Sequence, residues 1–165
     1  MKVCLFVASV FFATCASAQT IQVTSELSMS GKIVEAFHGS KPNGETQTYS
    51  DIKNVPYRKA VRQIGGEAKV EPGLYETGFK MQITPVIASE GMVRYRLSVS
   101  QRTLTKLEPK KVGNLVIDLP ASTDDSFTQS MIAKSGEPHE FRFGFDQATG
   151  TNKYTLKVTA TPLQD

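Results

Sequence analysis

The sequence predicts an all-β protein: an antiparallel β-sandwich or a partly open barrel of about eight or nine strands, with at most one short helix. Two observations lead to this prediction. Apolar residues recur with a period of two along most of the chain, which is typical of strands with one buried face. Turns that contain glycine or proline separate these runs at short intervals, and no long amphipathic helix pattern interrupts them.

The first element is residues 1–18, which we expect to be a signal peptide. Lys2 supplies the positive start, an apolar run follows, and Ala16-Ser17-Ala18 offers small residues to a signal peptidase. The apolar run is too short to span a bilayer as a helix. We therefore expect residues 19–165 to form a single β-rich domain, exported to the periplasm or cell envelope of a bacterium, with no transmembrane helix.

Cysteine usage and charge narrow the class of protein further. Both cysteines, Cys4 and Cys15, lie in the expected signal peptide, so the mature chain has no thiol for a disulfide or a thiolate metal site. Acylation of Cys15, as in a lipoprotein, is the alternative to simple cleavage. The formal net charge is only +3, whereas a nucleic-acid binder usually carries a concentrated basic face. We expect no nucleic-acid partner.

The N-terminal part of the mature chain has one regular element. Residues 20–29 alternate apolar and polar side chains and are predicted to form a strand. Residues 32–37 are apolar without clean alternation, so their type stays open. Lys41-Pro42-Asn43-Gly44 is typical of a turn and indicates an exposed loop over residues 39–47.

The next segment contains the only expected helix. Pro56 lacks a backbone donor and restricts residues 52–57 to a sheet edge or an irregular connection. Residues 58–64 are predicted to form one or two helical turns, which Gly65-Gly66 ends. The wet side of this short helix would carry Arg58, Lys59 and Arg62.

Residues 78–102 form the clearest element, an antiparallel hairpin around Ser89-Glu90-Gly91. In both halves apolar residues alternate with polar ones, so one face of the hairpin is apolar and the other is polar and cationic. The side chains expected on the buried face are Phe79, Met81, Ile83, Val93, Tyr95, Leu97 and Val99.

Further strands are predicted in the C-terminal part of the sequence. An exposed loop is indicated by Lys106, Lys110 and Lys111, and residues 112–119 are predicted to form a strand. Residues 122–125 are expected to be a polar turn, with Asp124 and Asp125 bonding locally to the backbone. After a strand at 127–134, a second hairpin is expected around residues 146–150, because Phe141, Phe143 and Phe145 alternate before it and Tyr154, Leu156, Val158 and Ala160 after it.

Candidate catalytic and metal-binding residues are few. His38 and His139 lack partners at a recognised metal-ligand spacing, and the chain contains no Gly-x-Ser-x-Gly sequence. We therefore expect a protein that is not an enzyme and that has no cofactor and no metal.

One part of the chain resembles a known family. Gly78-Phe79-Lys80-Met81-Gln82-Ile83-Thr84-Pro85, followed by Gly91 and the alternation at 93–99, is similar to the C-terminal β-domain of the bacterial secretins. Residues 126–143, with the turn Ser135-Gly136-Glu137, resemble a later part of that domain. The resemblance implies a secretin-related β-module that works in type II or type III secretion or in type IV pilus assembly.

Four residues are candidates for contact with a partner. Arg94, Arg96 and Arg102 lie even numbers of positions apart, so in a strand their side chains would point to the same side and form a cationic stripe on a sheet face. Val23 marks the strand at 20–29, which is expected to be a free edge able to add to a partner's sheet. The expected partner is an envelope protein, self-association included, and association with the outer membrane is left open. The alternative function is a soluble periplasmic binding or inhibitor β-sandwich with no assembly role.

Overall fold

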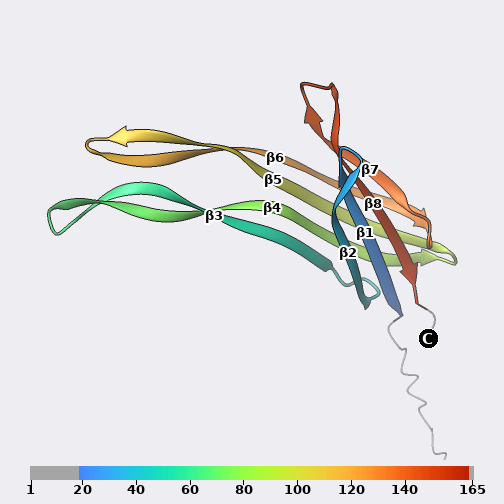
Figure 1. Cartoon of the computed structure of the whole chain (residues 1–165). Coiled ribbons are helices and arrows are strands. Elements are labelled where there is room, and N and C mark those ends of the chain that lie inside the picture. The colour runs from blue at the N-terminus through green and yellow to red at the C-terminus, as the bar shows by residue number, and fades with distance from the viewer. Residues whose placement is uncertain (1–18, 164–165) are drawn as a thin grey trace, which may run out of the picture.

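Residues 19–163 are described by a computed structural model, in which they form two four-stranded antiparallel sheets (Figure 1). Sheet A has the strand order β2-β1-β8-β7, and its strands are β1 (Thr20–Met29), β2 (Lys32–Pro42), β7 (His139–Asp146) and β8 (Thr151–Pro162). Sheet B has the order β3-β4-β5-β6, and its strands are β3 (Gln47–Ile64), β4 (Glu67–Ser89), β5 (Met92–Val112) and β6 (Leu115–Lys134). The predicted antiparallel all-β fold is confirmed, and residues 19–163 contain no helix.

The core lies between the two sheets and follows the period-two pattern of the sequence. The seven side chains expected on the buried face of β4 and β5 are all at most 2% exposed. Sheet A meets them with its own alternating set, which is Ile21, Val23, Leu27, Phe141, Phe143, Tyr154, Leu156, Val158 and Ala160. Each large apolar side chain buried in this way contributes about 1.5–3 kcal/mol, so the sandwich is held mainly by this layer.

Both predicted hairpins are confirmed. β4 and β5 pair antiparallel around Glu90-Gly91, where Gly91 has a φ of +71°. β7 and β8 pair around the turn at residues 147–150. Each turn lies where glycine removes the steric penalty of a positive φ.

The predicted helix at residues 58–64 is wrong, because this segment is the end of β3. It pairs with the start of β4 from Arg58↔Pro72 to Ile64↔Glu67, and Gly65-Gly66 forms the hairpin turn with φ values of +62° and +87°. Pairing with a neighbouring strand outweighs the weak helical spacing of the apolar residues here. The edge position expected from Pro56 is confirmed, since β3 is an edge strand of sheet B.

The predicted turn at residues 122–125 and the predicted lysine loop are also wrong. β5 runs without a break through Lys106 to Val112, the turn is Gly113-Asn114, and β6 continues past Asp124 and Asp125 to Lys134. Charged and hydroxyl side chains occur along these strands because much of their length is not covered by sheet A. The loop expected at residues 39–47 is shorter than predicted, since β2 extends to Pro42.

β1 is not a free edge, so this part of the interaction hypothesis is wrong. Val23 pairs with Gly39 of β2 on one side and with Ala160 of β8 on the other, and its side chain is fully buried. The expected signal peptide at 1–18, with Cys15, lies outside the described residues. Residues 19–163 contain no helix that is long and apolar enough to cross a membrane.

Candidate protein-interaction surface

Sheet B is much longer than sheet A, and its far half forms two separate hairpin arms (Figure 1). Pairing between β4 and β5 ends at Gly78↔Arg102. Beyond this point β3 pairs only with β4, and β5 pairs only with β6. We call residues 52–78 the first arm and residues 102–124 the second arm.

Gly78 explains where the first arm leaves the sheet. Its φ is +120°, a conformation that side-chain-bearing residues rarely adopt. A Cβ atom at this position would lie 2.1 Å from the backbone oxygen of Asp51 on β3. Only glycine therefore permits this close approach of β3 and β4 at the base of the arm.

The two arms are joined by an ion pair between their outer strands. Arg58 of β3 donates to Asp118 of β6 from its backbone nitrogen (2.8 Å), from Nε (2.9 Å) and from its terminal guanidinium nitrogen (2.5 Å). Asp118 is only 8% exposed. A second link joins the hydroxyl oxygens of Tyr75 and Ser122, which are 2.6 Å apart. The side chain of Asp118 thus occupies a backbone donor on the edge of β3 that a neighbouring strand would otherwise use.

The hydrogen bonds from Arg58 hold the pKa of Asp118 at about 2, below its ordinary value of 3.8. A lowered pKa means that Asp118 binds a proton more readily in the unfolded chain, so its contribution to stability is complete above pH about 4 and is lost as the pH falls to about 2. Asp118→Asn should therefore flatten the acid limb of a plot of melting temperature against pH. Asp124→Asn, in an exposed pair, is the control. Parallel acid limbs for the wild-type and Asp118→Asn proteins would contradict the assignment.

Eight of the ten exposed large apolar side chains in residues 19–163 lie on the arms or on the nearby ends of sheet A. On the arms, Leu74 is 67% exposed and Leu119 is 43% exposed. The others at this end lie at the arm tips and on the nearby ends of sheet A, and they are Met29, Ile33, Val34, Ile64, Val112 and Phe145. Concentrations of exposed apolar surface mark sites of contact with other molecules.

A cleft of about 480 Å³ lies between the sheets at the base of the arms. Met29 and Val34 of sheet A and Val55, Phe79 and Leu104 of sheet B give it an apolar lining. Its polar residues are Glu35, Asp51, Lys53, Thr77, Gln101, Arg102 and Thr103. This volume and this mixture of side chains are usual for a site that takes a small molecule or a few side chains.

Two carboxylates, Glu35 and Asp51, lie at this cleft. Glu35 accepts a hydrogen bond of 2.7 Å from the hydroxyl of Tyr49. Desolvation, together with the neighbouring Asp51, raises the pKa of Glu35. The hydrogen bond to Glu35 in turn raises the pKa of Tyr49 to about 12. Within residues 19–163, neither carboxylate forms an ion pair with a lysine or arginine.

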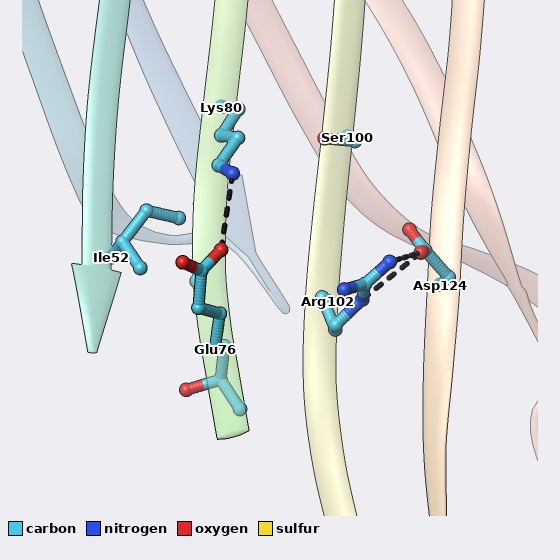
Figure 2. Close-up of a pocket in the computed structure, with 8 residues that line it drawn as sticks. Ile52, Glu76, Lys80, Ser100, Arg102 and Asp124 are labelled. Atoms are coloured by element: carbon cyan, nitrogen blue, oxygen red, sulfur yellow. Dashed lines mark hydrogen bonds and ion pairs between the residues drawn. The ribbon is translucent and has the colours of Figure 1, made fainter. Parts of the chain in front are cut away.

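Figure 2 shows the other face of sheet B, at the point where the arms begin. Lys80 pairs with Glu76 at 3.4 Å, and Arg102 pairs with Asp124 at 2.6 Å across β5 and β6. The hollow between them is small, about 60 Å³, and it is lined by charged and hydroxyl groups together with Ile52 and Gly78. The charges here largely neutralise one another, so this region is a solvated sheet face.

The structure separates the four residues that the sequence marked as candidates. Val23 lies in the core, whereas Arg94, Arg96 and Arg102 lie together on the exposed face of β5, as their parity predicts. Asp124 neutralises Arg102. Arg94 and Arg96 have no ion-pair partner among the described residues, so the cationic stripe is confined to these two positions.

The two histidines lie on opposite edges of sheet A. His38 belongs to β2 and hydrogen-bonds Gln22 at 3.1 Å, while His139 belongs to β7. In the described part of the chain, no three histidine, aspartate or glutamate side chains gather in a way that would hold a metal ion.

Comparison with known proteins gives a structural likeness but no match to a family model or a curated protein. Among solved structures, the chain is similar to the InvG secretin domain beta-barrel from the Salmonella SPI-1 injectisome NC-base, with a TM-score of 0.48 and 8% sequence identity. The match covers 89% of this chain and 61% of that one, which is less than two thirds of its length. The expected resemblance to the secretin β-domain is confirmed as a weak likeness in the arrangement of strands.

Proposed function

We propose that this chain is an exported, non-enzymatic envelope protein that works by protein–protein contact through its two arms, as a β-module of a secretion or pilus apparatus. The partner is an envelope protein, a second copy of this chain included. The secretin-like sequence at residues 78–85 and 93–99 supports this setting.

The observation that carries the proposal is that the two arms expose both sheet edges and leucine side chains. They extend beyond sheet A, their outer strands β3 and β6 are edge strands, and they bear exposed Leu74 and Leu119. Within the described residues, and apart from the Arg58 nitrogen that Asp118 occupies, these edges offer unpaired backbone donors and acceptors. The exposed leucines offer apolar area, and the two together are the components of strand-mediated contact. Ile132 is also exposed, but it lies on the part of β6 outside the arms.

The test replaces the apolar contacts on the arms while leaving the sandwich core intact. Leu74→Lys/Leu119→Lys should fold normally, because both side chains are exposed, but should lose its complex with the envelope. Interface side chains that matter cost about 1 kcal/mol or more each, so the pair should raise the dissociation constant of the complex by about thirtyfold or more. Fractionation of cells, with circular dichroism of the purified variants, makes the measurement.

Ile132→Lys/Leu163→Lys is the matched control, since it adds the same two charges at exposed apolar positions away from the arms. This control should stay with the envelope fraction as the wild-type protein does. If the folded Leu74→Lys/Leu119→Lys protein also stays there undiminished, the arms are not the contact surface and the proposal fails.

The cleft favours a second candidate, a soluble periplasmic binding or inhibitor protein. Its volume of about 480 Å³ falls in the range of small-molecule sites. Such a protein would appear wholly in the osmotic-shock fraction, whereas an assembly component would sediment with the envelope or form oligomers that resist SDS. The same fractionation therefore separates the two candidates.

A further inference from the structure

From the charges of the cleft and of the arms, we infer that the tip of the second arm of one copy docks in the cleft of another copy. The tip is residues 110–116, and the cleft is the one that contains Glu35 and Asp51. This inference rests on the proposed function and names its partner as a second copy of this chain.

The cleft combines an apolar lining with an excess of negative charge. Glu35 and Asp51 face one lysine, Lys53. Arg102 also borders the cleft, but its guanidinium group pairs with Asp124 at 2.6 Å on the other face of sheet B. A ligand that brings apolar side chains together with positive charge would satisfy both features.

The tip of the second arm has the complementary character. Lys110 and Lys111 are exposed, and within residues 19–163 neither forms an ion pair. Next to them, Val112 is 42% exposed, and Leu115 and Val116 are half-buried across the turn. The tip therefore presents two free ammonium groups beside an apolar cluster.

The tip of the first arm does not fit in the same way. Its charges are matched within the arm, since Arg62 pairs with Glu71 and Lys69 pairs with Glu67. It retains exposed Ile64, but its cations are paired with carboxylates, unlike Lys110 and Lys111. Charge complementarity thus selects the second arm.

The geometry requires a second molecule. From Arg102 to Val112 the arm is an extended strand, and at about 3.3 Å per residue it carries the tip roughly 33 Å away from the cleft at its base. The tip cannot return to its own cleft without losing this strand. Contact between unlike surfaces of two copies repeats from one copy to the next, giving a ring or an open chain.

Sedimentation of the full chain over a range of concentrations provides the test. Lys110→Glu/Lys111→Glu should raise the dissociation constant of self-association about tenfold or more, because like charges would then meet at the cleft. Lys41→Glu/Arg94→Glu makes the same change of charge on exposed residues that are unpaired in the described part of the chain and lie away from tip and cleft, and should leave self-association unchanged. For the wild-type chain, raising the ionic strength should weaken self-association.

Reversing the charge of the cleft as well as that of the tip supplies the decisive comparison. Adding Glu35→Lys and Asp51→Lys to the tip variant should restore self-association, provided that circular dichroism shows the protein folded. Equal self-association of the wild-type and tip variants would overturn the inference, as would independence from salt. If the wild-type chain stays monomeric while its arms still bind another envelope protein, the inference fails and the proposed function stands. If the arms bind nothing, both fail.

Discussion

Leu97→Ala is expected to lower the free energy of unfolding by about 2–5 kcal/mol. Leu97 lies on β5 between the two sheets, and its side chain has no exposed surface. Truncation removes apolar contacts on both sides and leaves a cavity, because the paired strands hold the backbone in place. Denaturant titration of the two proteins measures the difference.

Arg96→Ala is the matched control for this substitution. Arg96 is the preceding residue, its side chain is exposed, and among the described residues it forms no ion pair. Its replacement should change the free energy of unfolding by less than about 0.5 kcal/mol. Equal losses at the two positions would mean that the assignment of the faces of β5 is wrong.

Gly78→Ala should be almost as damaging, with a loss of roughly 3 kcal/mol or more. A residue other than glycine held at a positive φ costs about 1–3 kcal/mol, and forcing a methyl group into a filled space costs a similar amount. The new Cβ would lie 2.1 Å from the backbone oxygen of Asp51, so β3 and β4 would have to separate at the base of the first arm. The same denaturant titration measures this loss.

Gly31→Ala separates the two causes. Gly31 has a φ of +76°, but nothing lies within 4 Å of an added Cβ. This variant should show the cost of the backbone conformation alone. If Gly78→Ala is no more destabilised than Gly31→Ala, the close approach of β3 and β4 at Gly78 is not the constraint described above.

The sandwich half of the fold could be predicted from the sequence because one face of each strand is dry. Met81, Leu97 and their neighbours alternate with polar residues, and the buried set follows from that alternation. The turns at Gly91 and at residues 147–150 follow from glycine and polar residues between such runs. The buried side chains and the turns could thus be predicted without knowing which strands pair.

The arms could not be predicted in this way, since both faces of an arm carry polar residues and the contrast between faces is lost. Lys110 and Lys111 therefore read as a loop, and the segment at 58–64 reads as a helix. Bulges add to this, because the registers shift at residues 58–60 and 104–106 and interrupt the alternation. The signal that remained was glycine at 65–66 and 113, each lying between two β-prone runs.

Contacts between distant residues were also out of reach. Arg58 and Asp118 are 60 residues apart in the sequence. They lie on β3 and β6, the two edge strands of sheet B, and they meet only because the two arms approach each other. Likewise, the position of Val23 in a central strand depends on β8, which returns from the C-terminal end to pair with β1. Local pattern reveals which residues form a strand but not which strands become neighbours.

The most direct test of contact through the arms is photo-crosslinking in living cells, with a photoreactive amino acid placed in turn at Leu74, Leu119 and Ile132. All three side chains are exposed, so each replacement should leave the fold intact. Adducts with an envelope protein or a second copy of this chain are expected at Leu74 and Leu119, and none at Ile132. Adducts at Ile132 alone, with none at either arm position, would contradict contact through the arms.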